Sequence, residues 1–218
     1  MATTTDRLIR LVRNEQTTLA LLSVLVGLGA AIGCVAFRYL IAGTQLVTWG
    51  AATERLASHV ADMPWWLILL IPTAGGFVVG LLRRYVAADQ RFHGVADVVE
   101  ATALRGGRIT LRDGLVGAAG AALSLGVGGS AGREGPVVHL GAMMASFLSR
   151  KFGLRRSAML TLLGCGVASA VATSFNAPIA GVFFALEVVV GHYGLIAFAP
   201  VVLASVVGTI VTRIHYGD

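Results

Sequence analysis

Residues 128–136, GGSAGREGP, are the stretch whose residue types could most readily do chemistry. They combine four glycines with a neighbouring arginine and glutamate, and they end in a proline. Pro136 suits the first turn of a helix, where its missing N–H would have no partner anyway. A helix starting near Glu134 would present unpaired backbone N–H groups and the positive end of its dipole, which together bind anions. A carboxylate there would occupy the anion's position when ionised and leave it when protonated. We therefore predict an anion site in which Glu134 is both gate and proton carrier.

The same glycines allow other interpretations. The GxSxG pattern around Ser130 is typical of a hydrolase nucleophile, and His139 or His192 would have to act as its base, although no acid partner is evident. An intramembrane serine hydrolase is therefore the alternative function. Residues 126–131 fit a relaxed dinucleotide fingerprint, but they follow an uncharged apolar segment. Glycines used only for helix packing would leave a buried Glu134 without a role.

The elements that must position these residues are membrane helices. Of the 218 residues, 56% are hydrophobic and 13% charged, and the mean hydropathy is +0.80. This composition excludes disordered, collagen-like and disulfide-stapled secreted proteins. Charged residues are absent from five stretches, most of them long enough to cross a hydrocarbon core as a helix: 16–37, 63–82, 114–132, 157–186 and 188–212. Glu134 and Glu187 are the only acids between Gly114 and Thr212.

The pattern predicts an all-α integral membrane protein, a multi-span bundle with about seven or eight membrane helices. A first span covers about 17–47, a second lies between the Trp65–Trp66 pair and Arg83–Arg84, and a last span covers 196–214. Residues 6–15 predict an amphipathic helix at the cytoplasmic interface, so we divide the chain into that helix (1–15) and a transmembrane domain (16–218). Spaced glycines at 29 and 33, and at 76 and 80, predict close helix contacts.

Several helices should be broken or re-entrant. Residues 95–104 are too short to cross, and the glycine cluster after a span at 115–127 leaves only 14 residues before the next basic loop. A second break is expected at 174–178, SFNAP. Non-helical backbone at membrane depth persists only where it is buried in protein or lines a polar cavity. Broken helices aimed at a midplane substrate are typical of transporters.

The formal charge of +6 comes mainly from basic clusters between the apolar stretches. Short basic loops face the cytoplasm by the positive-inside rule, so we expect a multi-pass plasma or inner-membrane protein with a cytoplasmic N-terminus and no nucleic-acid partner. Cys34 and Cys165 lack partners at metal or redox spacing and are expected to be small buried hydrophobes. Nothing in the sequence indicates a metal or an organic cofactor.

Three motifs together resemble the chloride channel (CLC) family of anion channels and anion/proton antiporters. They are GREGP at 132–136, SFNAPIAGVFFALE at 174–187 and, more weakly, LASVVGT at 203–209. The resemblance extends over nearly the whole chain. It implies a transporter or channel, voltage-gated in some members, rather than an enzyme. It also implies chloride as the leading substrate, and protons and the lipid bilayer as further partners.

The resemblance assigns roles residue by residue. Glu134 matches the family's gating glutamate, and the amides around Arg133, Glu134 and Gly135 match its outer anion site. Residues 92–97, FHGVAD, align with a signature in which a serine helps to bind the central anion. His93 takes that position here and Gly94 follows it. An imidazole N–H could donate in place of the hydroxyl, although a hydrogen-bonded packing role for His93 is equally compatible with the sequence.

Two departures from the family pattern bear on mechanism. Antiporters of the family usually carry an inner proton glutamate where this chain has Val188, which puts proton coupling in doubt. Glu187 aligns with a carboxylate beside the proton route; its alternative role is a buried acid paired with an arginine. The family is built from two inverted halves, and this resemblance covers the first. We therefore expect a missing second half, in the same or another chain, and a homodimer in the complete protein.

Overall fold

The computed structural model describes residues 15–52, 58, 60, 61, 63–86 and 94–217, and within these residues the chain is helical with no strand. The elements are α2 (Glu15–Trp49), α4 (Trp65–Tyr85), α5 (Val95–Leu104), α6 (Leu111–Gly126), α7 (Glu134–Lys151), α8 (Arg156–Phe175), α9 (Pro178–Phe184), the π-helical segment η1 (Ala185–Val190) and α10 (Leu195–Tyr216). Helices α2, α4, α8 and α10 are long and apolar enough to cross a membrane. The all-α, multi-span prediction is confirmed. The interfacial helix predicted for 6–15 lies outside the described residues except for its last position.

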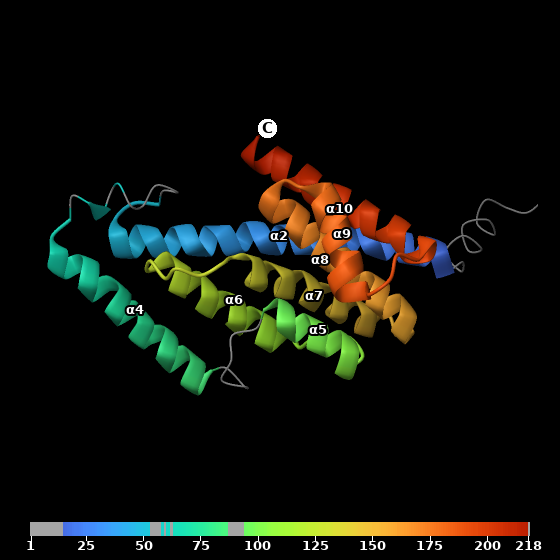
Figure 1. The fold of residues 1–218 in the computed structure, drawn as a ribbon, viewed down its shortest axis with the longest axis horizontal. Helices are drawn as coiled ribbons and strands as arrows, with labels where there is room; N and C mark the ends of the chain where they lie inside the picture. The colour runs from blue at the N-terminus through green and yellow to red at the C-terminus, as the bar shows by residue number, and fades with distance from the viewer. Residues whose placement is uncertain (1–14, 53–57, 59, 62, 87–93, 218) are drawn as a thin grey trace, which may run out of the picture.

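Helix α8 lies at the centre of the bundle and packs against α7, α10, α2, α9 and η1 (Figure 1). Its most apolar window is 83% buried. Residues 164–170, GCGVASA, explain this, because small side chains let neighbouring backbones approach. A Cβ added at Gly166 would overlap the carbonyl oxygen of Gly141 in α7, and the reverse also holds. Cys165 is fully buried here and Cys34 nearly so, as the sequence predicted.

Helix α4 lies at the edge of the bundle, and only 6% of its apolar window is buried (Figure 1). Its one buried residue is Gly75, where a Cβ would come within 2.5 Å of Val127 Cγ1. The sequence predicted close contacts at Gly76 and Gly80, but a Cβ added at either would meet no atom of the described chain within 4 Å. The prediction for this helix was therefore wrong by one residue.

The paired glycines of α2 give a mixed result. Gly29 packs under Met144 of α7, since a Cβ there would lie 2.9 Å from Met144 Cε, whereas Gly33 faces open space. Gly27, which the spacing did not single out, makes the closest backbone contact, 3.0 Å from its Cβ position to Ala204 Cα of α10. The Ser169 hydroxyl also donates to Gly27 O at 2.7 Å. Helix α2 thus packs on α10 at Gly27 and on α7 at Gly29, and of the two predicted glycines only Gly29 makes a contact.

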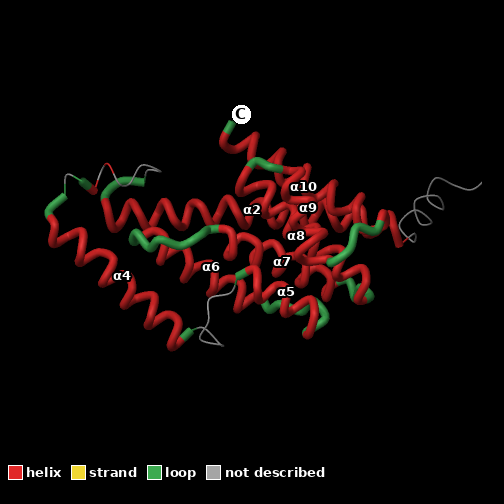
Figure 2. Tube along the Cα trace, viewed as in Figure 1, coloured by secondary structure: helices red, strands yellow, loops and turns green. Residues whose placement is uncertain are grey.

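Both predicted helix breaks are confirmed. Helix α6 ends at Gly126, and the chain turns back through Gly128, whose φ of +96° is strained for any residue with a Cβ. The loop then runs back along the bundle before α7 begins (Figure 2). At the second break Asn176 is left-handed, with φ 52°, and Pro178 starts α9.

The start of α6 differs from the prediction. It begins at Leu111 rather than Leu115, because Thr110 caps it: the Asp113 N–H donates to Thr110 Oγ1 at 3.2 Å. The charged Arg112 and Asp113 hid this first turn from a search for uncharged spans. The outer limits of α2 and α10 agree with the predicted spans to within two residues.

Candidate anion site

The site predicted at residues 132–136 lies where two helices begin side by side. Gly135 of α7 faces Gly94, the residue before α5, and a Cβ at Gly135 would lie 3.4 Å from Gly94 Cα. At the other end of α5, the Ile109 N–H donates to Ser146 Oγ of α7 at 2.9 Å. The two helices therefore run parallel with their N-termini together. Both dipoles present their positive ends to one place.

The depth of this place follows from the length of α5. Its ten residues rise about 15 Å from the level of Gly94 to the basic loop at 105–110. That loop lies at the same end of the bundle as the C-terminus of α7, since Arg150 Nη2 donates to Ile109 O at 3.2 Å. About 15 Å is half the thickness of a hydrocarbon core. If the basic loop lies at the membrane surface and α5 runs along the membrane normal, the paired N-termini would start near mid-depth, as re-entrant helices of transporters do.

The N-terminus of α7 offers unpaired donors. The first hydrogen bond at this end runs from Val137 N–H to Arg133 O at 3.3 Å. Within the described chain, the N–H groups of Arg133, Glu134 and Gly135 have no acceptor. Pro136 has no N–H to satisfy. Three consecutive donors at a positive helix end are what an anion requires.

The Glu134 side chain turns back over the glycine loop. A Cβ at position 132 would overlap Glu134 Oε2, so the absence of a side chain at Gly132 provides the space for this carboxylate. Glu134 and the Arg133 side chain are both exposed in the described chain. A negative charge at the N-terminus of its own helix is favourable. The carboxylate is therefore held beside the unpaired amides rather than directed away from them.

Asp97 is a contributor that sequence reasoning missed. Its Oδ2 accepts the Gly94 N–H at 2.8 Å and so caps the N-terminus of α5. The sequence signal was an acidic residue three positions after the cap, which is half of a capping box. In this conformation the Gly94 amide is already occupied by the Asp97 carboxylate, in contrast to the three amides at the start of α7. His93, the predicted side-chain donor, lies outside the described residues.

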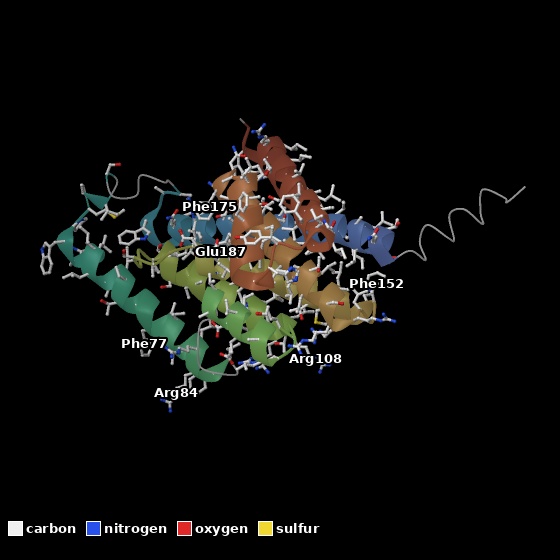
Figure 3. All side chains as sticks on the ribbon, turned by 45° about the vertical axis from the view of Figure 1, so that its right-hand side comes forward. Phe77, Arg84, Arg108, Phe152, Phe175 and Glu187 are labelled. Carbon is white, nitrogen blue, oxygen red and sulfur yellow. The ribbon has the colours of Figure 1, made fainter. Side chains whose placement is uncertain are left out.

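Glu187 lies on η1 (Figure 3). Both η1 and α7 pack against α5. Its side chain is exposed and accepts a hydrogen bond from the Tyr193 hydroxyl, with Oη and Oε2 3.4 Å apart. Desolvation and the nearby carboxylate raise the pKa of Tyr193, which further favours the protonated phenol as a donor. The alternative of a buried Glu187 paired with an arginine is wrong for the described residues. Val188 is half-buried and packs against the hydrophobic core.

The geometry gives no support to the serine hydrolase alternative. Ser130 lies in the exposed loop, whereas His139 is buried in α7 at 4% exposure. His192 uses Nδ1 to accept the Gly194 N–H at 3.2 Å. Among the described residues neither histidine is hydrogen-bonded to Ser130.

The fold is that of a helical integral membrane protein whose candidate site lies at helix breaks. The family model described as voltage gated chloride channel matches residues 75–218. A ClcB-like chloride channel protein of Ralstonia nicotianae is 36% identical over 200 residues, covering 88% of this chain and 46% of that protein. The chain therefore belongs to the voltage-gated chloride channel (CLC) family.

Other relatives are also named as ClC-type channels or antiporters. The voltage-gated ClC-type chloride channel ClcB of Salmonella typhi is 30% identical over 203 residues, covering 91% of this chain and 48% of that protein. A CLC-type fluoride/proton antiporter superposes with a TM-score of 0.71 and 28% identity, over 100% of this chain and 49% of that one. A slow cyanobacterial Cl−/H+ antiporter gives a TM-score of 0.73 at 22% identity, over 92% and 47%, which bears on the fold alone. The chain spans about half the length of the curated relatives it matches.

Proposed function

We propose that this chain supplies part of a transmembrane path for a small monovalent anion, with chloride as the first candidate. The observation that carries the proposal is the meeting of two helix N-termini at Gly94 and Gly135, with unpaired amides beside the Glu134 carboxylate. Relatives named as chloride channels support chloride. Fluoride is the alternative anion, because a structural relative is a fluoride/proton antiporter.

In this proposal Glu134 is the gate. When ionised, its carboxylate competes with the anion for the amides of residues 133–135, because both are negative acceptors. When protonated, it loses most of that competition and the anion takes its place. Gly132 leaves room for the carboxylate in the occupied position. Anion passage is then linked to proton uptake at this one residue.

We propose that Glu187 takes part in proton movement on the inner side of the membrane, where antiporters of the family usually carry a second glutamate. Val188 provides no carboxylate, whereas Glu187 is exposed next to the protonated Tyr193 hydroxyl. Replacing Glu187 by Gln should lower proton movement more than chloride movement if the protein is an exchanger. Equal proton movement in both forms would remove Glu187 from the route.

We also propose that the remaining anion ligands come from a second half, in the same or another chain, because each relative is about twice as long. The complete protein would dimerise through α10, whose exposed large side chains include Leu203, Val206 and Ile210. The basic end of the bundle would face the cytoplasm, together with the N-terminus.

The test uses the full-length protein as encoded by its gene, reconstituted in liposomes. Glu134→Gln should retain chloride efflux and lose its pH dependence, since glutamine mimics the protonated acid. Glu100→Gln is the matched control, because Glu100 pairs with Arg105 at the far end of α5, with Oε1 and Nη2 2.6 Å apart. Efflux from the control should follow pH as in the unmodified protein. If Glu134→Gln still responds to pH normally, the gate is elsewhere.

Two further measurements separate the alternatives. Running the same efflux assay with fluoride identifies the preferred anion. Ser130→Ala should leave efflux intact, and Ser130 should not react with a fluorophosphonate probe; labelling at Ser130 would revive the hydrolase alternative.

A further inference from the structure

The basic end of the bundle carries more positive charge than its own acids neutralise. Arg108 and Arg112 flank the start of α6, and Arg150 and Lys151 end α7; all four are exposed. Within the described chain none of the four has an ion pair. The adjacent acid, Asp113, accepts a hydrogen bond from Thr110 Oγ1 at 2.5 Å as part of the helix cap. Arg84 and Arg108 lie along the lower edge of the view in Figure 3.

Helix dipoles favour only two of these four cations. Arg150 and Lys151 stand in the last turn of α7, where cations are favourable. Arg112 is the second residue of α6, and a cation in the first turn of a helix is unfavourable. One backbone contact, Arg112 Nη2 to Val86 O at 3.3 Å, provides an acceptor but no negative charge. The charge of the cluster would favour an anion bound beside it.

A hollow lies within this cluster, between the start of α6 and the end of α7. It is a shallow, open depression lined by Thr110, Leu111, Phe147, Arg150 and Lys151. Phe147 and Leu111 provide apolar surface, and the two cations and the threonine provide polar surface. Arg150 is held in place by its 3.2 Å hydrogen bond to Ile109 O, which leaves its other N–H donors available.

We propose that this hollow binds the phosphoryl headgroup of an anionic glycerophospholipid from the surrounding bilayer. Arg150 and Lys151 would bind the phosphate, with Arg108 and Arg112 adding long-range attraction. One acyl chain would leave over Leu111 and then Leu115, one turn further along α6 and 58% exposed. A free phosphate would gain only the charge contacts, whereas a phospholipid uses both the charged and the apolar surface. The bilayer source is thus favoured.

The test measures thermal unfolding of the purified full-length protein after delipidation in a neutral detergent. Phosphatidylglycerol, phosphatidylcholine or inorganic phosphate is added back. The variant is Arg150→Gln with Lys151→Gln. The matched control is Arg155→Gln with Arg156→Gln, which removes the same charge at two exposed residues that do not line the hollow. Lys151→Gln alone serves as a second variant if loss of the Arg150 contact to Ile109 prevents folding.

Phosphatidylglycerol should raise the Tm of the unmodified protein and of the control by similar amounts. It should raise the Tm of the Arg150/Lys151 variant by less than half as much, and Lys151→Gln should give an intermediate shift. Phosphatidylcholine and inorganic phosphate should have little effect on any form. Equal losses in both double variants would mean a diffuse charge effect and overturn the site. An equal Tm rise with phosphatidylcholine, or with inorganic phosphate, would overturn the proposed headgroup or the lipid source.

Discussion

Helix α7 makes two glycine–glycine contacts, and their consequences are opposite. At Gly141 it contacts Gly166 of α8 in the buried core, so closely that a Cβ on either glycine would overlap the other's carbonyl oxygen. At Gly135 it contacts Gly94, where a Cβ would have ordinary van der Waals separation and the surroundings are half-exposed. The first contact fixes α7 against the core. The second leaves space and unpaired amides beside Glu134.

The difference shows why glycine content alone does not locate a membrane site. In the core pair, both residues lie well inside their helices, away from the unpaired groups of the helix ends. In the second pair, both lie at helix N-termini. Asp97 caps the Gly94 amide, whereas within the described chain the amides at the start of α7 have no acceptor. Close approach is common to both contacts; only the second also exposes polar backbone. We therefore propose a function for the second contact and a packing role for the first, and three substitutions test this proposal.

The largest effect is expected from Gly141→Ala. The added methyl overlaps backbone that cannot move away without shifting α8, so we expect a loss of about 2–3 kcal/mol in unfolding free energy. Thermal unfolding of the purified protein measures this. Gly33→Ala is the matched control, because its methyl meets open space and alanine favours a helix interior. If both variants are equally stable, the core contact is not as tight as described.

Gly135→Ala should separate function from stability. Its methyl lies 3.4 Å from Gly94 Cα, so unfolding free energy should change by less than about 1 kcal/mol. The methyl also stands next to the unpaired amides, so chloride efflux should fall several-fold. A normal efflux rate would show that the anion does not pass between these two helices.

The smallest effect is expected from Asp97→Asn. The amide oxygen can still accept the Gly94 N–H, so the cap is retained and stability should change by only a few tenths of a kcal/mol. Removal of a negative charge near the paired N-termini should tighten chloride binding modestly, as measured by isothermal titration calorimetry. Weaker binding would mean that Asp97 orders the site by its charge.

The sequence predicted the helix breaks well because their chemistry is local. Gly128 and Asn176 adopt left-handed conformations, and Pro178 starts a helix, which short-range steric rules anticipate. It failed where the answer depended on which face of a helix meets a neighbour. Gly75 rather than Gly76 packs against Val127, and no local property distinguishes these adjacent glycines.

The candidate site was anticipated in part for the same reason. Glu134 and the amides beside it follow from the GREGP pattern, whose effect is confined to one helix end. The convergence with Gly94 and the hydrogen bond from Gly94 to Asp97 depend on how α5 is placed against α7. The Tyr193 contact to Glu187 depends likewise on the turn after η1.

The edge position of α4 has a mechanical consequence for the protein in its bilayer. A helix with so little of its surface covered within the chain adjusts its tilt when hydrocarbon thickness changes. Its one buried residue, Gly75, packs against Val127, which directly precedes the glycine loop that leads to Glu134. If Glu134 is the gate as proposed, a change in tilt would reach it through the contact of α4 with Val127. Anion flux should therefore depend on lipid chain length, and Val127→Ala should weaken that dependence.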